Sequence, residues 1–184
     1  MTLRISGIVK ESIVDGRGLR LVVFCQGCPH HCPGCHNPQT HDFEGGTEVD
    51  IEKIVDEVLK NPVLQGVTFS GGEPFCQAQA FYELGKRLKG IPGRRLDLMV
   101  YSGWTYDQLL EKSKTEPGVK RLLGICDTLM DGPYIEAQRD LTLRYRGSRN
   151  QRYIDLIRTR MTGRLFLVEE ESYSDRRKNL RRGL

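Results

Sequence analysis

Short apolar runs alternate with stretches of helical periodicity through the first 132 residues of the chain. Runs rich in apolar and β-branched residues are typical of buried strands. Four such strands are predicted, over residues 19–24, 66–70, 96–102 and 124–132. Between them, apolar side chains recur at helical spacing in residues 51–59 and 78–88, which predicts two amphipathic helices.

Polar residues mark where helices are expected to begin. Asp50 stands directly before the first helix, where its carboxylate would accept from free backbone N–H groups. Thr105 and Gln108 form a capping-box pattern, which predicts a third helix. After the fourth strand the pattern weakens, and segments 151–159 and 164–170 are expected to be a strand pair or late additions to the fold.

The alternation of strand and helix predicts parallel strands joined by right-handed crossovers within one α/β domain. About four such units fit into the chain, whereas a closed eight-stranded barrel takes about 250 residues. We therefore expect an incomplete parallel β/α barrel, with its chemistry at the carboxyl ends of the strands. Polar or glycine-rich segments follow all four strands, at residues 25–37, 70–74, 101–104 and 131–134. Their placement predicts a single site.

Composition and charge narrow the class of protein. The chain is 38% hydrophobic and 28% charged, and no apolar run reaches the roughly 18–20 residues of a membrane helix. The amino terminus lacks the apolar core of a signal peptide, so a cytoplasmic location is expected. Residues 172–184 carry part of the net charge of +4 and are expected to be a solvated tail or a docking patch. We expect neither a membrane nor nucleic acid as a partner.

Four of the six cysteines lie within eleven residues, in the segment FCQGCPHHCPGCHN. In the reducing cytoplasm this density indicates metal binding rather than disulfides. Two CxxC knuckles separated by three residues would make a cramped zinc site, and the bacterial ferredoxin spacing is absent. If Cys25 ends the first strand as a core residue, Cys28, Cys32 and Cys35 remain. Three thiolates on a four-iron cluster would leave one iron open.

The spacing C-x3-C-x2-C on a loop after the first strand resembles the signature of radical S-adenosylmethionine enzymes. The SGGEP sequence after the second strand looks like the glycine-rich motif of that family. The resemblance implies a 4Fe-4S cluster on Cys28, Cys32 and Cys35, whose open iron binds S-adenosylmethionine. It also implies that the backbone of Gly71 and Gly72 meets the methionine amino group, a close approach that glycine permits.

Further motifs resemble the glycyl-radical activating enzymes of this superfamily. DGRGLR at 15–20 is similar to their DGPG-R motif, with Arg17 where proline is common. CPGCHNPQTHDFEGG, DGPY and RGSRNQR resemble the small activators of anaerobic ribonucleotide reductase, and the likeness spans residues 6–153. It implies a radical S-adenosylmethionine domain over 1–158 and a C-terminal extension over 159–184.

The activity implied by this resemblance is an oxidoreductase reaction. S-adenosylmethionine would be cleaved reductively, and a hydrogen atom would be taken from a backbone glycine of anaerobic ribonucleoside-triphosphate reductase. A flavodoxin or ferredoxin is the implied electron donor. The alternatives are activation of another glycyl-radical enzyme, such as pyruvate formate-lyase, and a zinc-binding interaction module.

The resemblance also places residues beside S-adenosylmethionine. Gly34, Cys35 and His36 are implied to flank the cofactor. His36 or the backbone near Gly34 is expected to face the adenine, because the aromatic residue common before the third cysteine is absent. Ser102 and Asp131 stand at strand ends suited to hydrogen bonds with ribose or methionine, or to capping.

Several polar residues near these motifs have two interpretations. His30 and His31 either tune the cluster through hydrogen bonds or lie exposed on the loop. The RGSRNQR segment either helps to dock the partner or binds the cofactor through Asn150. Cys76 and Cys126 are expected to be structural thiols.

Overall fold

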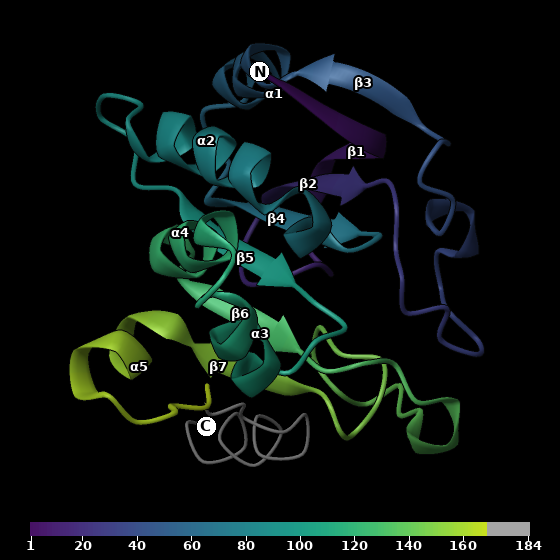
Figure 1. Ribbon diagram of the computed structural model, residues 1–184. Coiled ribbons are helices and arrows are strands. Elements are labelled where there is room, and N and C mark those ends of the chain that lie inside the picture. Colours follow the sequence, from purple (N-terminus) through teal and green to yellow (C-terminus); the bar gives the residue numbers. More distant parts are fainter. Residues whose placement is uncertain (169–184) are drawn as a thin grey trace, which may run out of the picture.

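The computed structural model describes residues 1–168, which form a seven-stranded sheet with helices packed on it (Figure 1). The strands follow the order β3-β1-β2-β4-β5-β6-β7. Their bounds are β1 Thr2–Ser12, β2 Arg20–Cys25, β3 Thr47–Asp50, β4 Gly66–Gly71, β5 Asp97–Tyr101, β6 Thr128–Asp131 and β7 Arg152–Asp155. The helices are α1 Ile51–Lys60, α2 Ala78–Lys89, α3 Tyr106–Lys112, α4 Pro117–Ile125 and α5 Leu156–Thr162. Short 3-10 turns span Pro38–Thr40, Pro74–Gln77 and Glu136–Gln138.

The centre of the sheet is parallel. Strands β2, β4, β5 and β6 lie side by side in chain order and run in the same direction, which confirms the predicted parallel strands. β1 and β3 add antiparallel strands beyond β2, and β7 pairs antiparallel with β6. The sheet is mixed because these outer strands pair antiparallel. It is open because β3 and β7 each pair on one side only. The predicted α/β class is confirmed at this level.

The hydrophobic pattern gave no sign of β1 or β3. β1 contains Gly7 and shifts its register against β2 twice. β3 has only four residues, and most of them are exposed. Short or irregular strands of this kind bury too few side chains to produce a clear apolar alternation.

The predicted fourth strand over 124–132 is wrong in its first part. Gly124 and Ile125 belong to the last turn of α4, which begins at Pro117. This helix buries a stripe of apolar side chains at helical spacing, which the sequence pattern had not separated from the strand that follows. The strand itself starts at Thr128.

The segment after the fourth strand is a strand followed by a helix. The Asp155 carboxylate accepts the backbone N–H of Arg158 at 2.8 Å and so begins α5. The expected pairing with the later apolar segment is limited, among the described residues, to one antiparallel bridge between Ile154 and Leu167. Within the predicted segment 151–159, only Arg152–Asp155 is strand, and the residues from Leu156 onward belong to α5.

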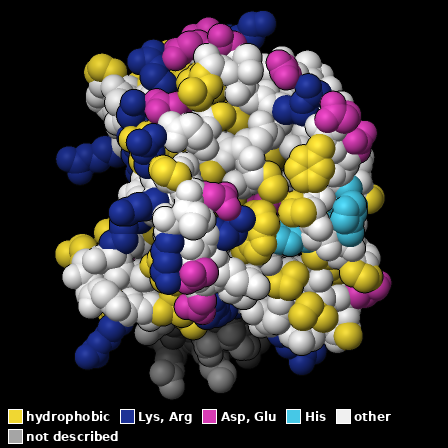
Figure 2. All heavy atoms as spheres, in the orientation of Figure 1, with side chains coloured by type: hydrophobic (Ala, Val, Ile, Leu, Met, Phe, Trp, Pro, Cys, Tyr) yellow, Lys and Arg dark blue, Asp and Glu magenta, His cyan; other side chains and the backbone are white. Residues whose placement is uncertain are grey.

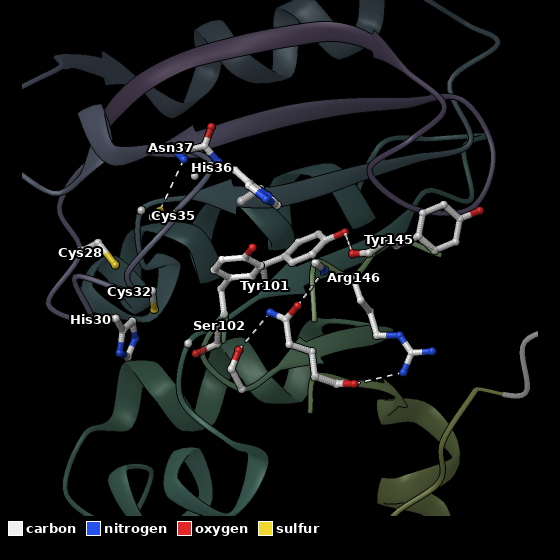
Figure 3. A pocket seen from close by; sticks show the side chains of 18 of the residues that line it. Cys28, His30, Cys32, Cys35, His36, Asn37, Tyr101, Ser102, Tyr145 and Arg146 are labelled. Carbon is white, nitrogen blue, oxygen red and sulfur yellow. Dashed lines mark hydrogen bonds between the residues drawn. The ribbon is translucent and has the colours of Figure 1, made fainter. Parts of the chain in front are cut away.

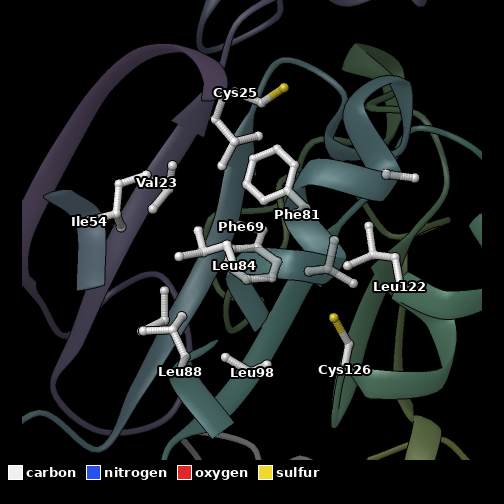
Figure 4. Packing of buried hydrophobic residues seen from close by; sticks show 14 of the residues in the cluster. Val23, Cys25, Ile54, Phe69, Phe81, Leu84, Leu88, Leu98, Leu122 and Cys126 are labelled. Carbon is white, nitrogen blue, oxygen red and sulfur yellow. The ribbon is translucent and has the colours of Figure 1, made fainter. Parts of the chain in front are cut away.

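One face of the sheet carries the main apolar core. Strand residues such as Phe69 and Leu98 share this core with side chains of α1, α2 and α4 (Figure 4). Phe69 from β4 and Phe81 from α2 meet there with ring centroids 4.8 Å apart. Burial of this apolar area is the dominant stabilising contribution to the fold.

The opposite face has a smaller and more polar interior. Its apolar cluster consists of Met99, Met130 and Tyr153. Arg20 is buried on the same face, where its Nε donates to Thr68 Oγ1 at 2.7 Å and its guanidinium pairs with Asp97 at 2.6 Å. Arg20, the last residue of the DGRGLR motif, therefore connects β2 to β4 and β5 at their amino-terminal ends.

Both predicted helix starts are confirmed. Asp50 Oδ1 accepts the N–H of Glu52 at 3.0 Å at the start of α1. Thr105 and Gln108 form a complete capping box at the start of α3. These side chains satisfy backbone donors that the first turn of a helix leaves free.

The domain boundary predicted at residue 158 falls inside helix α5, and only 159–168 of the expected extension is described. The end of segment 164–170 and the basic tail at 172–184 lie outside the described residues. Within residues 1–168, no helix combines the length and the apolar character needed to cross a membrane.

Candidate functional site

A cavity of about 420 Å³ lies at the carboxyl ends of the parallel strands. Its wall combines the cysteine loop (residues 26–41), the glycine-rich turn after β4, and the segments after β5 and β6. This confirms the predicted convergence of four segments on one site. All four histidines belong to the cysteine loop, and Figure 2 shows histidine side chains at the surface on this side of the molecule.

All three thiols of the predicted ligand set line this cavity (Figure 3). Cys28 is buried, whereas Cys32 and Cys35 are partly exposed. Cys28 N donates to His41 O at 3.2 Å, and the N–H of Asn37 donates to Cys35 Sγ at 3.4 Å. In the part of the chain that the structure describes, no three His, Cys, Asp or Glu side chains form a site for a single metal ion.

Cys25 is the last residue of β2 and belongs to the main apolar core. Its sulfur accepts from Gln77 Nε2 at 3.1 Å and lies 3.5 Å from Glu73 O. Burial raises the pKa of this thiol above its ordinary value. The structure thus places Cys25 as the sequence predicted, as a small core residue at the end of β2.

The Cys28 thiol has a pKa raised to about 11. Burial is the main cause; a hydrogen bond from the His30 backbone opposes it, and the charge of Glu73 adds to it. Without metal this residue is therefore a neutral thiol near pH 7. Binding of iron would release its proton.

The glycines of the SGGEP turn permit a very close approach of two backbones. Gly71 has φ +88°, and a Cβ there would lie 2.7 Å from Cys25 N. A Cβ on Gly72 would lie 2.5 Å from Gly27 O. Gly72 N also donates to Cys25 O at 2.8 Å, which pairs the turn with the start of the cysteine loop. Glycine is required here by the protein's own packing, and both residues also line the cavity.

Ser102 lines the cavity, as the sequence predicted for a cofactor contact. Its Oγ donates to Glu73 Oε2 at 3.0 Å and accepts the N–H of Trp104 at 3.0 Å. The hydroxyl is thus already engaged with the protein. A role for Ser102 beside the cofactor stays a prediction.

Asp131 does not lie on the cavity wall. Its carboxylate accepts from Arg152 Nε at 3.0 Å and from the backbone N–H of Tyr106 at 2.6 Å, the first residue of α3. Met130 packs on the polar face of the sheet, so Asp131, one residue on, points to the helix-covered face. This geometry favours the capping role and gives the predicted cofactor contact no support.

His36 and Gly34 occupy different positions relative to the cavity. His36 lines it and packs against Tyr134, with ring centroids 4.9 Å apart. Gly34 has φ +73° and lies outside the wall, where a Cβ would meet the Glu136 carboxylate at 3.0 Å. Of the two, His36 is therefore the side chain placed to face a bound group.

The RGSRNQR segment contributes to the wall through residues other than the one predicted. Asn150 is not on the wall; its Nδ2 donates to Pro133 O at 2.8 Å. Arg146 and Gln151 do line the cavity. Tyr145, which the sequence analysis did not identify, lies there with φ +60°, and its carbonyl accepts from Tyr101 OH at 2.6 Å.

Comparison with known proteins assigns a family to this arrangement. The model of the 4Fe-4S single cluster domain matches residues 14–154. The anaerobic ribonucleoside-triphosphate reductase-activating protein of Haemophilus influenzae is 32% identical over 146 residues, which cover 76% of this chain and 89% of that protein. The chain belongs to the family of the anaerobic ribonucleoside-triphosphate reductase-activating proteins. The protein of the same name from Escherichia coli K12 is 30% identical over 146 residues, 76% of this chain and 90% of its own length.

A second kind of relative shares a shorter region. The pyruvate formate-lyase-activating enzyme of Clostridium pasteurianum is 37% identical over 115 residues, which cover 59% of this chain and 48% of that enzyme. The 4Fe-4S match includes all three cavity cysteines and every segment of the wall described above.

The residues that line the cavity fit the 4Fe-4S cluster that the matched family implies. Three thiols lie on one cavity, and the Gly71–Gly72 turn leaves a bare backbone edge beside them. The volume of about 420 Å³ falls within the range of about 300–1,000 Å³ that is usual for small-molecule and cofactor sites. Thiolate sulfur is also the usual protein ligand of iron–sulfur clusters.

Proposed function

We propose that this protein is a radical S-adenosylmethionine enzyme that generates the glycyl radical of anaerobic ribonucleoside-triphosphate reductase. The observation that carries the proposal is the placement of the three C-x3-C-x2-C thiols and the glycine turn on one cavity. The names of the relatives that share most of their length with this chain support the choice of reductase.

Each wall segment has a task in this proposal. Cys28, Cys32 and Cys35 would hold a 4Fe-4S cluster, with one iron left for S-adenosylmethionine. When bound, these cofactors supply the electron transfer and the 5′-deoxyadenosyl radical that takes the glycine hydrogen. The carbonyl groups of Gly71 and Gly72 would accept from the methionine amino group.

The rest of the wall would orient and shield the cofactor. His36, supported by Tyr134, would face the adenine, with the backbone of Gly34 and Cys35 alongside. Tyr101 lines the cavity, and its hydroxyl group donates to the carbonyl of Tyr145, another residue of the wall.

The open sheet suits a protein substrate. We propose that the sheet corresponds to an incomplete β/α barrel whose missing strands leave room for the partner's glycine-bearing segment. Leu141 is highly exposed and lines the cavity together with Leu143, which would give this segment an apolar surface to contact. The proposed setting is cytoplasmic, with flavodoxin or ferredoxin as electron donor.

Activation of a formate-lyase is the second candidate, because one relative carries that name. The coverage separates the two. The alignment spans 89% of the reductase-activating protein from Haemophilus influenzae but 48% of the formate-lyase-activating enzyme. The nearly complete coverage of the reductase activator favours the reductase as the target.

The direct test is electron paramagnetic resonance on the anaerobically reconstituted, reduced protein mixed with S-adenosylmethionine and the reductase. We expect a glycyl-radical signal that disappears in Cys28→Ala. A loaded cluster with no radical on the reductase, but a radical on a formate-lyase, would transfer the proposal to the second candidate. Bound zinc without acid-labile sulfide would instead favour a zinc-binding interaction module.

A further inference from the structure

Glu73 is a fully buried carboxylate at the centre of the site loops. Its Oε1 accepts the N–H of Phe75 at 3.0 Å. Its Oε2 accepts from His30 Nε2 at 2.7 Å, from Ser102 Oγ at 3.0 Å and from Gly103 N at 2.9 Å. Four donors thus meet one side chain, and two of the three segments involved are far from it in sequence. We call Glu73, His30, Ser102 and Gly103 the Glu73 clasp.

A second, independent contact fixes His30. A Cβ on Gly103 would lie 2.4 Å from His30 Cδ2, so the imidazole ring lies flat in a slot that any larger residue would fill. Trp104 closes the slot from another side, with its ring centroid 4.7 Å from that of His30 in an edge-on arrangement. His30 is therefore held by shape as well as by its hydrogen bond. It does not hang free on the loop.

The position of His30 in the chain shows which two parts of the site the clasp connects. His30 lies between Cys28 and Cys32 on the cysteine loop, and Glu73 directly follows Gly72 on the cavity turn. Ser102 lies on the wall beside both. One carboxylate therefore joins the loop that carries the thiols to the turn that would meet the methionine end of the cofactor.

We propose that Glu73 and His30 are positioning residues that hold the iron-binding loop in register with the S-adenosylmethionine-binding turn. The inference rests on the proposed function, which it deepens by assigning roles to two residues that the cluster motif leaves open. Outer partners of metal ligands are known to orient those ligands and to tune the metal. In this chain the link runs through a histidine of the cysteine loop rather than through a ligand itself.

The chemistry of the clasp requires a carboxylate. Every group that contacts Glu73 is a donor, and a carboxylate accepts on both oxygens. In Glu73→Gln, the amide nitrogen must face either Phe75 N or the three donors on the other side. At least one buried donor then loses its partner, although the shape of the side chain is unchanged.

The test compares three variants of the clasp and one control variant with wild type, each as the full chain reconstituted anaerobically with iron and sulfide. Glu73→Gln and His30→Leu remove the link, whereas His30→Gln keeps a side-chain N–H donor. His31→Asn is the matched control, since it changes the neighbouring exposed histidine, and asparagine tolerates the positive φ of 45° found there.

Three readouts are compared. The first is the rate at which a ferrous chelator removes iron. We expect this rate to rise by about 10- to 100-fold in Glu73→Gln and His30→Leu, the range found when residues that support metal ligands are replaced. The second is the change that S-adenosylmethionine causes in the electron paramagnetic resonance spectrum of the reduced cluster, which should weaken in both. The third is amide hydrogen exchange at Gly103, which should quicken. His30→Gln should recover part of each effect, and His31→Asn should match wild type.

The outcomes separate the clasp from the function. If Glu73→Gln and His30→Leu hold iron, respond to S-adenosylmethionine and protect the Gly103 amide as wild type does, the clasp is wrong and the proposed function stands. If His31→Asn loosens the cluster equally, the effect belongs to the loop in general and the clasp is also wrong. If wild type binds no cluster, the proposed function fails, and exchange at Gly103 still decides whether Glu73 and His30 hold the loops together.

Discussion

The helix-covered face of the sheet buries Phe69, Phe81 and Leu98 in one continuous apolar core, whereas the opposite face buries Arg20 and carries the cavity. The same strands supply both faces, since alternate residues point to opposite sides. Cys25 illustrates the division: it lies in the apolar core, three residues before the cavity thiol of Cys28.

The difference shows how a small domain separates stability from reactivity. Apolar burial on the helical side is extensive and holds the strands together. The cavity side can then expose carbonyl edges, thiols and an open mouth without relying on them for folding. Substitutions on the two faces should therefore affect different measurements.

The largest expected effect contrasts two neighbouring cysteines. Cys28→Ala, Cys32→Ala and Cys35→Ala should each lose the cluster and all glycyl-radical formation, because the proposed 4Fe-4S cluster takes all three thiols of the cavity wall as ligands. Cys25→Ala should keep the iron content of wild type, because its sulfur faces the core. Iron and acid-labile sulfide per chain measure this, and equal losses in Cys25→Ala would break the contrast between the faces.

The next effect concerns stability alone. Phe81→Ala should lower the free energy of unfolding by about 3–5 kcal/mol, the usual cost of removing a large core side chain. Tyr101→Phe on the cavity face should cost about 0.5–1.5 kcal/mol, the net contribution of one hydrogen bond. Urea titration of both variants checks the ordering. A larger cost for Tyr101→Phe would show that the cavity face also carries the fold.

Arg20 gives a smaller effect on the polar face. Arg20→Met would leave the Thr68 hydroxyl and the Val67 carbonyl without this partner, at a cost of about 1–3 kcal/mol. Arg87→Met, at an exposed ion pair with Glu52, should leave the free energy of unfolding close to that of wild type, because solvent screens such pairs. Thermal or urea unfolding distinguishes them, and equal costs would mean that the buried arginine adds nothing specific to the fold.

The smallest effect lies at the start of α3. Thr105→Ala removes the helix cap and should cost about 1 kcal/mol while cofactor binding stays unchanged. Thr115→Ala, an exposed threonine outside the cap, should stay close to wild type. A loss of S-adenosylmethionine binding in Thr105→Ala would instead connect this helix to the cavity.

The sequence predicted most strongly where a signal was local. Runs of β-branched residues located β2, β4 and β5, and the cysteine spacing located the cavity thiols, because both depend on residues a few positions apart. The helix α4 was missed because its Pro-Gly start is typical of a loop and its end runs directly into the next strand. The proposed partial barrel depends on the curvature of the sheet, which the hydrophobic pattern does not report.

The clasp could not be predicted in the same way. Glu73 stands in the quoted SGGEP motif, but its partners His30 and Ser102 lie 43 and 29 residues away in the chain. Asp131 shows the converse problem, because a polar residue at a strand end can point to either face. The sequence does not show why position 103 is glycine. The structure explains it, because His30 packs against Gly103 and leaves no room for a side chain.

The cavity wall joins segments from opposite ends of the described chain, the cysteine loop near the start and residues 141–151 near the end. A ribosome adding about 5–20 residues per second makes the thiols on the order of ten seconds before the wall that faces them. During that interval the three cysteines have no cover from residues 141–151. The growing chain, rather than the finished protein, is therefore the form in which these thiols are most open to oxidation.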